Sequence, residues 1–406
     1  MNILLVHQNF PGQFKHLTPV LLKDPRNTVV AFTMNDYQGP ESLKVVRYQA
    51  AKGTAKDVHP WAAETETKVI RGDAAFRAAL ALKESGFTPD LILAHPGWGE
   101  SLFLKQVWPR ANMVIYCEFY YAEQGSDVGF DPEFASNSPA DQCRVRMKNV
   151  NNLLHFDIAD AGISPTEWQK STFPEPFRSN IEVVHDGIHT DALKPNPDAW
   201  LKLGERRLTR DDEIITFVNR NLEPYRGYHV FMRALPAILK ARPKARVLIV
   251  GADGVSYGAK APDGKTWKQV FLDEVKSDLD VSRVHFLGQI PYQHFVTLLQ
   301  LSTVHVYLTY PFVLSWSLLE AMSCGCAIVA SDTKPLHEAI RHDQTGVLTS
   351  FFDAHALARC VNQLLNDPQT RERLGKNARA FAIKHYDLAQ VSIPKLTAMV
   401  ERYRPK

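Results

Sequence analysis

The 406-residue sequence has few cysteines, almost no net charge and no long apolar segment. Its five cysteines are an odd number scattered along the chain, which argues against a disulfide framework and against a cysteine-based metal site. Lysines and arginines number 47 and aspartates and glutamates 44, so we expect no dedicated nucleic-acid-binding face. No apolar run reaches the ~18 to 20 residues that a membrane-spanning helix needs, although peripheral membrane contact stays open.

The chain begins MNILLV at residues 1–6, without the basic segment and apolar stretch that are typical of a signal peptide. We therefore expect a folded strand at the start and a cytoplasmic protein, with the inner face of the membrane as a second candidate location. Hydrophobic residues are 45% and charged residues 22% of the sequence, an ordinary globular balance. At roughly 150 residues per domain, the length predicts two to three domains.

Short apolar segments alternate with helical patterns along the chain, which predicts two doubly wound α/β domains with parallel sheets. We expect an N-terminal domain over residues 1–190 and a C-terminal domain over 213–380. A polar, proline-punctuated linker over 191–212 joins them. Residues 381–406 are expected to form a helix that packs back on the N-terminal domain. Among the expected strands are 3–6, 28–33, 89–94, 113–117, 214–218, 245–250, 304–308 and 327–330.

Ligands of open parallel sheets bind at the carboxyl ends of the strands, so the residues after each strand are the first candidates. The segment YPFVLSWSLLEAMSCG at residues 310–325 follows a strand and opens a helix. Ser315, Trp316 and Ser317 lie where free N–H groups and the helix dipole suit a diphosphate. Glu320 could then reach a ribose hydroxyl. The spacing from Ser317 to Glu320 is also typical of a capping box, and both interpretations stay open.

This segment resembles the nucleotide-sugar site of the retaining glycosyltransferases of family 4, which have the GT-B fold. EAMSCGCAIVAS at residues 320–331 matches the family pattern closely, and PLHEAI at 335–340, DQTGVL at 343–348 and HDGIHTD at 185–191 are also similar. The resemblance implies two Rossmann-like domains that face each other across a cleft. The acceptor would bind on the N-terminal side and the nucleotide-sugar donor on the C-terminal side.

A second match, NRNLEPYRGY at residues 219–228, resembles the family element that supplies an arginine and a lysine to the donor diphosphate. The resemblance assigns these roles to Arg220 and Arg226, whose planar guanidinium groups suit phosphate. The alternative is a pair of solvated surface arginines. Gly12, in the loop after the first strand, is expected against the donor phosphate. Its alternative is a plain turn formed by Pro11 and Gly12.

Two positions depart from the family pattern. Phe312 stands where the family has the first of two glutamates, which leaves the identity of the transferred sugar open. Glu118 stands where the family often has an active-site histidine, and a carboxylate there would orient the acceptor or stabilise positive charge at the anomeric carbon. The alternative is a structural ion pair with an arginine. His95, after another strand, is expected at the acceptor site, with a structural histidine as the alternative. Glu338 is a second-rank candidate for the cleft.

The resemblance implies a retaining, metal-independent glycosyltransferase of polysaccharide or glycoconjugate synthesis. It would need no cofactor, because a UDP- or GDP-sugar is its co-substrate, and its acceptor would be a saccharide or a glycolipid. Arg220, Arg226 and the helix N-terminus would stabilise the leaving diphosphate in place of a metal ion. A sugar phosphorylase or epimerase, or a non-catalytic subunit that binds sugar nucleotides, stays open. A dinucleotide dehydrogenase is not expected, since no G-x-G-x-x-G follows the first strand of either domain.

Overall fold

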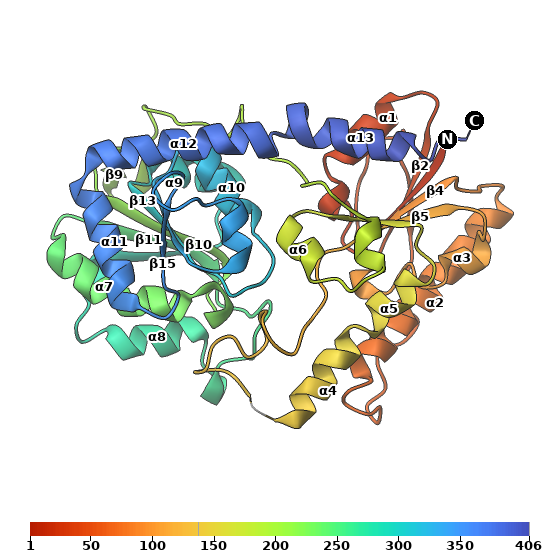
Figure 1. Cartoon of the computed structure of the whole chain (residues 1–406), viewed down its shortest axis with the longest axis horizontal. Helices are drawn as coiled ribbons and strands as arrows, with labels where there is room; N and C mark the ends of the chain where they lie inside the picture. Colours follow the sequence, from red (N-terminus) through yellow and green to blue (C-terminus); the bar gives the residue numbers. More distant parts are fainter. Residues whose placement is uncertain (137, 406) are drawn as a thin grey trace. The chain divides into compact units, whose positions relative to one another are not determined.

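The computed structural model describes residues 1–136 and 138–405, which form two compact α/β units. Unit 1 contains Met1–Gly187 and the C-terminal segment from Leu388 onward, and unit 2 is Ile188–Asp387. The chain therefore passes from one unit to the other twice. Figure 1 shows that each unit has a sheet of its own with helices around it. Among the described residues, no helix combines the length and the apolar character needed to cross a bilayer.

Unit 1 is built on a seven-stranded parallel sheet in the order β3-β2-β1-β4-β5-β6-β7. Central strands such as ILLV in β1 and LILA in β4 are apolar at successive residues because helices cover both faces of a parallel sheet. The strands are β1 (Asn2–Val6), β2 (Thr28–Thr33), β3 (Lys44–Arg47), β4 (Leu91–Ala94), β5 (Asn112–Tyr116), β6 (Ala161–Ser164) and β7 (Ile181–Val183).

Alternate residues of β1 pack on opposite faces of this sheet. Leu4 and Val6 belong to the core that α2 covers, and Ile3 and Leu5 belong to the core that includes Leu396 of α13. The C-terminal segment is therefore part of the core of unit 1. The helices of unit 1 are α1 (Leu17–Lys23), α2 (Ala63–Glu84), α3 (Leu104–Val107), α4 (Pro139–Lys148), α5 (Val150–Phe156), α6 (Glu167–Ser171) and α13 (Ile393–Glu401), with the short 3-10 helices η1 (Gly12–Phe14), η2 (Pro96–Trp98) and η3 (Phe177–Asn180).

Unit 2 is built on a six-stranded parallel sheet in the order β12-β11-β10-β13-β14-β15. Its strands are β10 (Ile214–Asn221), β11 (Arg246–Ala252), β12 (Val284–Gly288), β13 (Val304–Tyr307), β14 (Ile328–Ser331) and β15 (Val347–Thr349). The residues expected to form a linker, 191–212, lie in this unit and include an antiparallel hairpin of β8 (Leu201–Leu203) and β9 (Arg206–Leu208). They pack there because Leu193, Ala199 and Leu208 are buried in its core.

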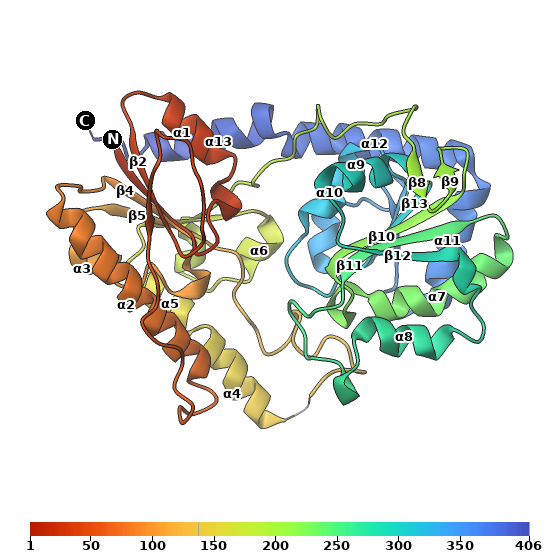
Figure 2. The ribbon, with the colours of Figure 1, turned by 180° about the vertical axis from the view of Figure 1, so that it is seen from behind.

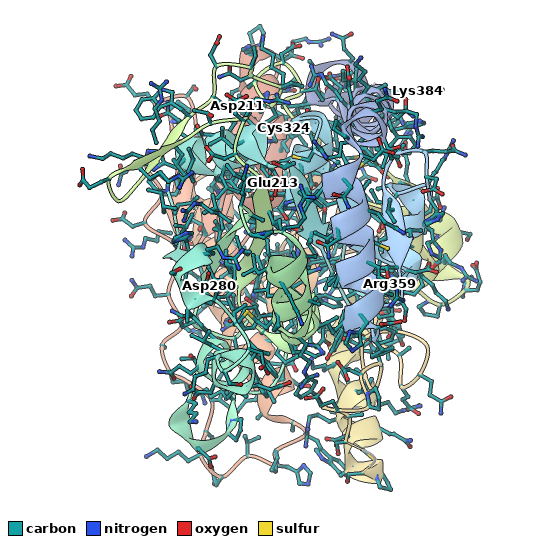
Figure 3. The ribbon with its side chains drawn as sticks, turned by 90° about the vertical axis from the view of Figure 1, so that its left-hand side faces the viewer. Asp211, Glu213, Asp280, Cys324, Arg359 and Lys384 are labelled. Atoms are coloured by element: carbon teal, nitrogen blue, oxygen red, sulfur yellow. The ribbon has the colours of Figure 1, made fainter. Side chains whose placement is uncertain are left out.

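Two layers of helices enclose the sheet of unit 2, with α7 and α8 on one face and α9, α10 and α12 on the other (Figure 2). On the first face, Phe217 of β10 stacks on Phe231 of α7 with 4.4 Å between the ring centroids. Glu213, labelled in Figure 3, precedes β10 and pairs with Arg242 at the end of α7. The helices are α7 (Tyr228–Ala241), α8 (Trp267–Val275), α9 (Tyr292–Leu301), α10 (Trp316–Ser323), α11 (Ala354–Asn366) and α12 (Pro368–Tyr386), with the 3-10 helices η4 (Pro224–Arg226), η5 (Pro262–Gly264), η6 (Val281–Arg283) and η7 (Lys334–Glu338).

Candidate functional site

In unit 2, the first N–H groups of α10 are hydrogen-bonded within the chain. Ser315 is the N-cap of this helix, and its Oγ accepts a hydrogen bond from the N–H of Ser317 at 3.3 Å. The N–H of Ser315 donates to the Tyr307 hydroxyl at 3.1 Å, which ties the helix start to the end of β13. Trp316 is 43% exposed. The expected helix start is confirmed, and it presents the positive end of the helix dipole.

Arg226 is buried beside this helix start. Its Nη1 donates hydrogen bonds to Thr309 Oγ1 at 2.7 Å, to the Val313 carbonyl at 3.1 Å and to the Tyr307 hydroxyl at 3.4 Å. Burial acts to lower the pKa of Arg226, but Tyr307 and Tyr257 raise it by more, so the guanidinium stays charged. The tertiary structure thus brings a fixed positive charge to the N-terminus of α10.

Arg220 differs from Arg226 in its surroundings. It lies in β10, is exposed, and makes no side-chain hydrogen bond or ion pair within residues 1–136 and 138–405. The sequence analysis left open that both arginines are solvated surface residues. The structure shows such an environment for Arg220, whereas Arg226 is buried and the alternative is wrong for it. A guanidinium without a protein partner can turn to a phosphate at little structural cost.

Glu223, which the sequence analysis did not single out, fixes the polar loop after β11. This buried carboxylate accepts hydrogen bonds from the N–H groups of Ser256 at 3.0 Å, Tyr257 at 3.2 Å and Gly258 at 3.1 Å. The Tyr257 ring is thereby held 5.3 Å from the guanidinium carbon of Arg226. In the sequence, the only indication of a role for Glu223 was its position between Arg220 and Arg226 in the segment that resembles the family element.

Phe312, which replaces the first family glutamate, is 5% exposed and packs among tyrosines. Its ring centroid lies 5.0 Å from that of Tyr257 and 5.5 Å from that of Tyr225, both in edge-on arrangements. Tyr225 also contacts Tyr310, at 4.7 Å between centroids. This position therefore presents an apolar ring edge and no carboxylate for a sugar hydroxyl.

The two glutamates predicted for the C-terminal domain lie in different surroundings. Glu320, on α10, accepts a hydrogen bond from the Tyr292 hydroxyl at 2.7 Å. The capping-box interpretation is wrong, because the N-cap is Ser315 and the third helical residue is Leu318. Glu338 ends η7 close to Tyr386, where burial and the charge of Glu338 raise the pKa of the tyrosine.

In unit 1, Gly12 lies in close contact with His7, the residue that follows β1. Gly12 has a φ of +44°, and a Cβ there would lie 2.1 Å from His7 Nε2, so the backbone requires glycine. His7 Nδ1 accepts from the N–H of Asn9 at 3.0 Å, so Nε2 carries the proton and donates to Gln13 Oε1 at 2.7 Å. Burial lowers the pKa of His7 to about 4, which keeps the ring neutral at pH 7.

His95 and Glu118 come together at the ends of β4 and β5. His95 Nδ1 accepts from the N–H of Gly97 at 3.2 Å, so its Nε2 carries a proton, and Nε2 lies 3.6 Å from Glu118 Oε2. Desolvation acts to raise the pKa of Glu118, but the neighbouring His95 outweighs it and lowers the pKa. The partner of Glu118 is thus a histidine, and the predicted alternative of an arginine is wrong.

His7, His95 and Glu118 form one cluster in unit 1. The ring centroids of His7 and His95 are 5.1 Å apart, and His95 stacks on Tyr116 at 5.3 Å. The Tyr116 hydroxyl donates to both carboxylate oxygens of Asp186, at 3.0 and 3.1 Å. The sequence analysis did not propose roles for His7, Tyr116 or Asp186. The sequence contained little indication of a functional role for these three residues, although each lies at or just after the end of a strand.

A pocket of about 410 Å³ lies beside this cluster and is formed by residues of unit 1. Its volume is in the range of small-molecule sites. His95 and Glu118 line it, and Glu118 is 47% exposed, so its carboxylate is accessible. The other lining residues used below are Glu64, Lys68, Arg71, Trp98, Tyr121, Lys148, Asn151 and Asn152.

Comparison with known proteins identifies two family matches that between them span most of the chain. Residues 25–193 match the Glycosyl transferase family 4 group, and residues 202–381 match Glycosyl transferases group 1. The GDP-mannose-dependent alpha-(1-6)-phosphatidylinositol monomannoside mannosyltransferase of Mycolicibacterium smegmatis is 25% identical over 306 residues, which is 71% of this chain and 72% of the relative. The D-inositol 3-phosphate glycosyltransferase of Corynebacterium aurimucosum is 28% identical over 202 residues, 49% of this chain and about half, 46%, of that relative.

Solved structures share the fold over the whole chain. Sucrose-phosphate synthase from Thermosynechococcus elongatus superposes with a TM-score of 0.72 at 19% identity, covering 99% of both chains. Anabaena HepE in complex with UDP-glucose gives a TM-score of 0.67 at 17% identity, covering 99% of this chain and 100% of HepE. The two parallel sheets, the matched segments and these similarities lead to one assignment: the chain belongs to glycosyltransferase family 4 and has the GT-B fold.

Proposed function

We propose that the protein is a retaining glycosyltransferase that moves a sugar from a nucleoside diphosphate sugar to an acceptor hydroxyl. The observation that carries this proposal is the buried, charged Arg226 held at the N-terminus of α10 by Thr309 and Tyr307. A helix start and a guanidinium at one place suit the two phosphates of such a donor. The HepE complexes with UDP and UDP-glucose support a nucleotide-sugar donor for this fold.

The departure of the diphosphate requires stabilisation of its growing negative charge. Arg226 supplies a preorganised charge, the N-terminus of α10 supplies the positive end of the helix dipole, and Arg220 closes on the phosphates when the donor binds. We propose that these groups make a metal ion and any further cofactor unnecessary. The acceptor proton passes to the leaving phosphate, as the family resemblance implies, so the chain need not supply a separate general base.

On the acceptor side, we assign the reacting hydroxyl to the pocket of unit 1. Glu118 is the ionised group there, and His95 Nε2 lies 3.6 Å from its carboxylate. A negative charge near the anomeric carbon stabilises the positive charge that develops as the donor bond breaks. Gly12 is assigned to the donor phosphate, because a glycine in the loop after β1 allows the backbone to approach a ligand closely. Glu338, at the end of η7 in unit 2, is a second-rank candidate.

A donor panel followed by a transfer assay tests the proposed function. A UDP- or GDP-sugar is expected to raise the melting temperature, because a ligand that binds only the native state stabilises it. With an acceptor, NMR should show that the product keeps the anomeric configuration of the donor, and excess EDTA should leave the rate unchanged. Loss of transfer in EDTA that magnesium or manganese restores would contradict the metal-independent mechanism. A requirement for free phosphate indicates a phosphorylase, and binding without transfer or hydrolysis indicates a non-catalytic subunit.

Glu320 offers a separate prediction about the nucleotide. If its carboxylate binds the ribose, Glu320→Gln is expected to weaken UDP binding by about 1.5–3 kcal/mol, the usual contribution of a hydrogen bond to a charged group. Calorimetry with UDP measures this, since no sugar is needed. Tyr292→Phe is the matched control, because it removes the hydrogen bond to Glu320 and leaves the carboxylate. If Glu320→Gln and Tyr292→Phe lose UDP affinity equally, the role of Glu320 is to hold the structure around α10 and not to bind the ribose.

A further inference from the structure

Lysine and arginine side chains outnumber carboxylates in the lining of the acceptor pocket of unit 1. Its walls come from α2, from the end of α4 and from α5, which lie together in unit 1 (Figure 1). Lys68 and Arg71 come from α2, and Lys148 is the last residue of α4. Glu64 and Glu118 are the carboxylates that line the pocket. The distribution of these charges indicates what the pocket binds.

Both carboxylates already have partners. Lys68 Nζ lies 2.8 Å from Glu64 Oε1, and Glu118 faces His95 at 3.6 Å. Arg71 and Lys148, in contrast, make no ion pair and no side-chain hydrogen bond within the described part of the chain. Lys148 Nζ lies 4.4 Å from the centre of the Tyr121 ring, a contact that positions the ammonium group without neutralising it. Arg71 and Lys148 are therefore available to bind an anionic group of a ligand.

Glu100, next to Arg71, does not neutralise this arginine fully. Glu100 is completely buried, and the Tyr48 side chain lies beside its carboxyl group. Burial raises the pKa of Glu100 to about 7, and the nearby charge of Arg71 lowers it by less. The carboxyl is therefore ionised in only part of the molecules at pH 7.

The remaining lining residues suit a hydroxylated ring. Asn151 donates through Nδ2 to the Pro96 carbonyl at 2.7 Å, but its buried Oδ1 accepts no hydrogen bond from a described residue. A buried acceptor without a donor is unfavourable, and a ligand hydroxyl would satisfy it. Trp98 and Tyr121 provide aromatic surface for the carbon face of a ring.

We propose that the acceptor is a phosphorylated sugar or polyol whose phosphate binds Arg71 and Lys148 in the pocket of unit 1. The guanidinium fork of Arg71 matches two phosphate oxygens, and Lys148 adds a point charge. The hydroxyl to be glycosylated lies toward Glu118 and His95. This inference rests on the proposed function, because it names the acceptor class of that same site.

Binding of phosphorylated and neutral ligands, measured without donor, tests the inference independently of catalysis. The soluble probes are glucose 6-phosphate and inositol 1-phosphate, with glucose, inositol and inorganic phosphate for comparison. Phosphatidylinositol in phosphatidylcholine vesicles is the second arm, and it separates a lipid headgroup from a free sugar phosphate. We expect at least one phosphate-bearing probe to bind 10-fold or more tightly than its neutral counterpart, and less tightly as the salt concentration rises.

Arg71→Gln and Lys148→Gln are each expected to weaken binding of that probe about 10- to 100-fold. Arg77→Gln is the matched control, since Arg77 lies on the same helix, is 76% exposed and pairs with Asp73. Melting temperatures verify folding, and the Lys148 variant leaves the surroundings of Glu100 intact. Wild-type affinity in both pocket variants, or equal binding of phosphorylated and neutral probes, would overturn the inference.

The outcomes separate the inference from the proposed function. Transfer to a neutral sugar, with no phosphate-dependent binding, overturns the inference and leaves the glycosyltransferase activity standing. Binding of a phosphorylated probe that depends on Arg71 and Lys148, with no transfer from any donor, supports the pocket assignment and contradicts the proposed function. Vesicle binding that depends on both residues, without binding of the soluble probes, supports the phosphate site and identifies its source as a lipid headgroup.

Discussion

Replacement of Glu118 by glutamine is expected to lower kcat about 100-fold or more and to leave donor affinity close to that of the wild type. The pKa of Glu118 is lowered, so the carboxylate is ionised at neutral pH, and it is accessible at the pocket. Glutamine keeps the shape of the side chain and removes its charge. A group that acts only in the transition state affects turnover and does not affect donor binding.

Steady-state kinetics at saturating donor, together with UDP calorimetry, measure the two effects separately. Glu84→Gln is a suitable control, because Glu84 is an exposed carboxylate at the end of α2 and does not line the pocket. Wild-type turnover in the Glu118 variant would leave only a structural role in holding His95. If the Glu118 variant loses donor binding, Glu118 holds the sugar of the donor. That is the role of the family carboxylate that Phe312 replaces.

The Arg226→Ala variant is expected to bind the donor about 10- to 100-fold more weakly and also to be less stable. The first effect follows from the loss of a charge-assisted contact of roughly 1.5–3 kcal/mol with the diphosphate. The second follows because Thr309 Oγ1 and the Val313 carbonyl lose a buried donor, at a cost of about 1–3 kcal/mol in the free energy of unfolding. Calorimetry with UDP and denaturant titration measure the two quantities.

Arg220→Ala separates binding from stability. Arg220 is exposed and has no side-chain partner in the described structure, so its removal is expected to weaken donor binding with almost no change in stability. Arg226→Lys adds a further comparison, since it keeps the positive charge and loses the planar fork. Wild-type donor affinity in Arg220→Ala and Arg226→Ala would contradict the diphosphate assignment.

Local sequence patterns were sufficient to predict the two parallel sheets. Apolar segments such as ILLV in β1 are continuous because both faces of each strand are covered, and this pattern needs no knowledge of the partners. The short helices α4, α5 and α6 were not predicted. α4 contains one buried residue, Val145, so its sequence has almost no apolar periodicity to detect.

Candidate residues were predictable where a local motif carries the chemistry. The strand end and helix start around Ser315 and Ser317 are adjacent in sequence, so this candidate donor-binding segment could be selected from its own residues. Arg220 and Arg226 come from one short motif and could not be distinguished there. Only tertiary packing places Arg226 against Thr309, 83 residues away, and leaves Arg220 in solvent.

The sequence by itself determined the fold class, the family and the segment that starts α10, because each depends on neighbouring residues. The tertiary structure decided the histidine partner of Glu118 and left Arg71 and Lys148 without an ion-pair partner among the described residues. Each of these depends on strands and helices that are distant in sequence and meet in unit 1. Burial, which shifts the pKa of groups such as His7, also arises only when these elements pack together, so no local pattern could have predicted it.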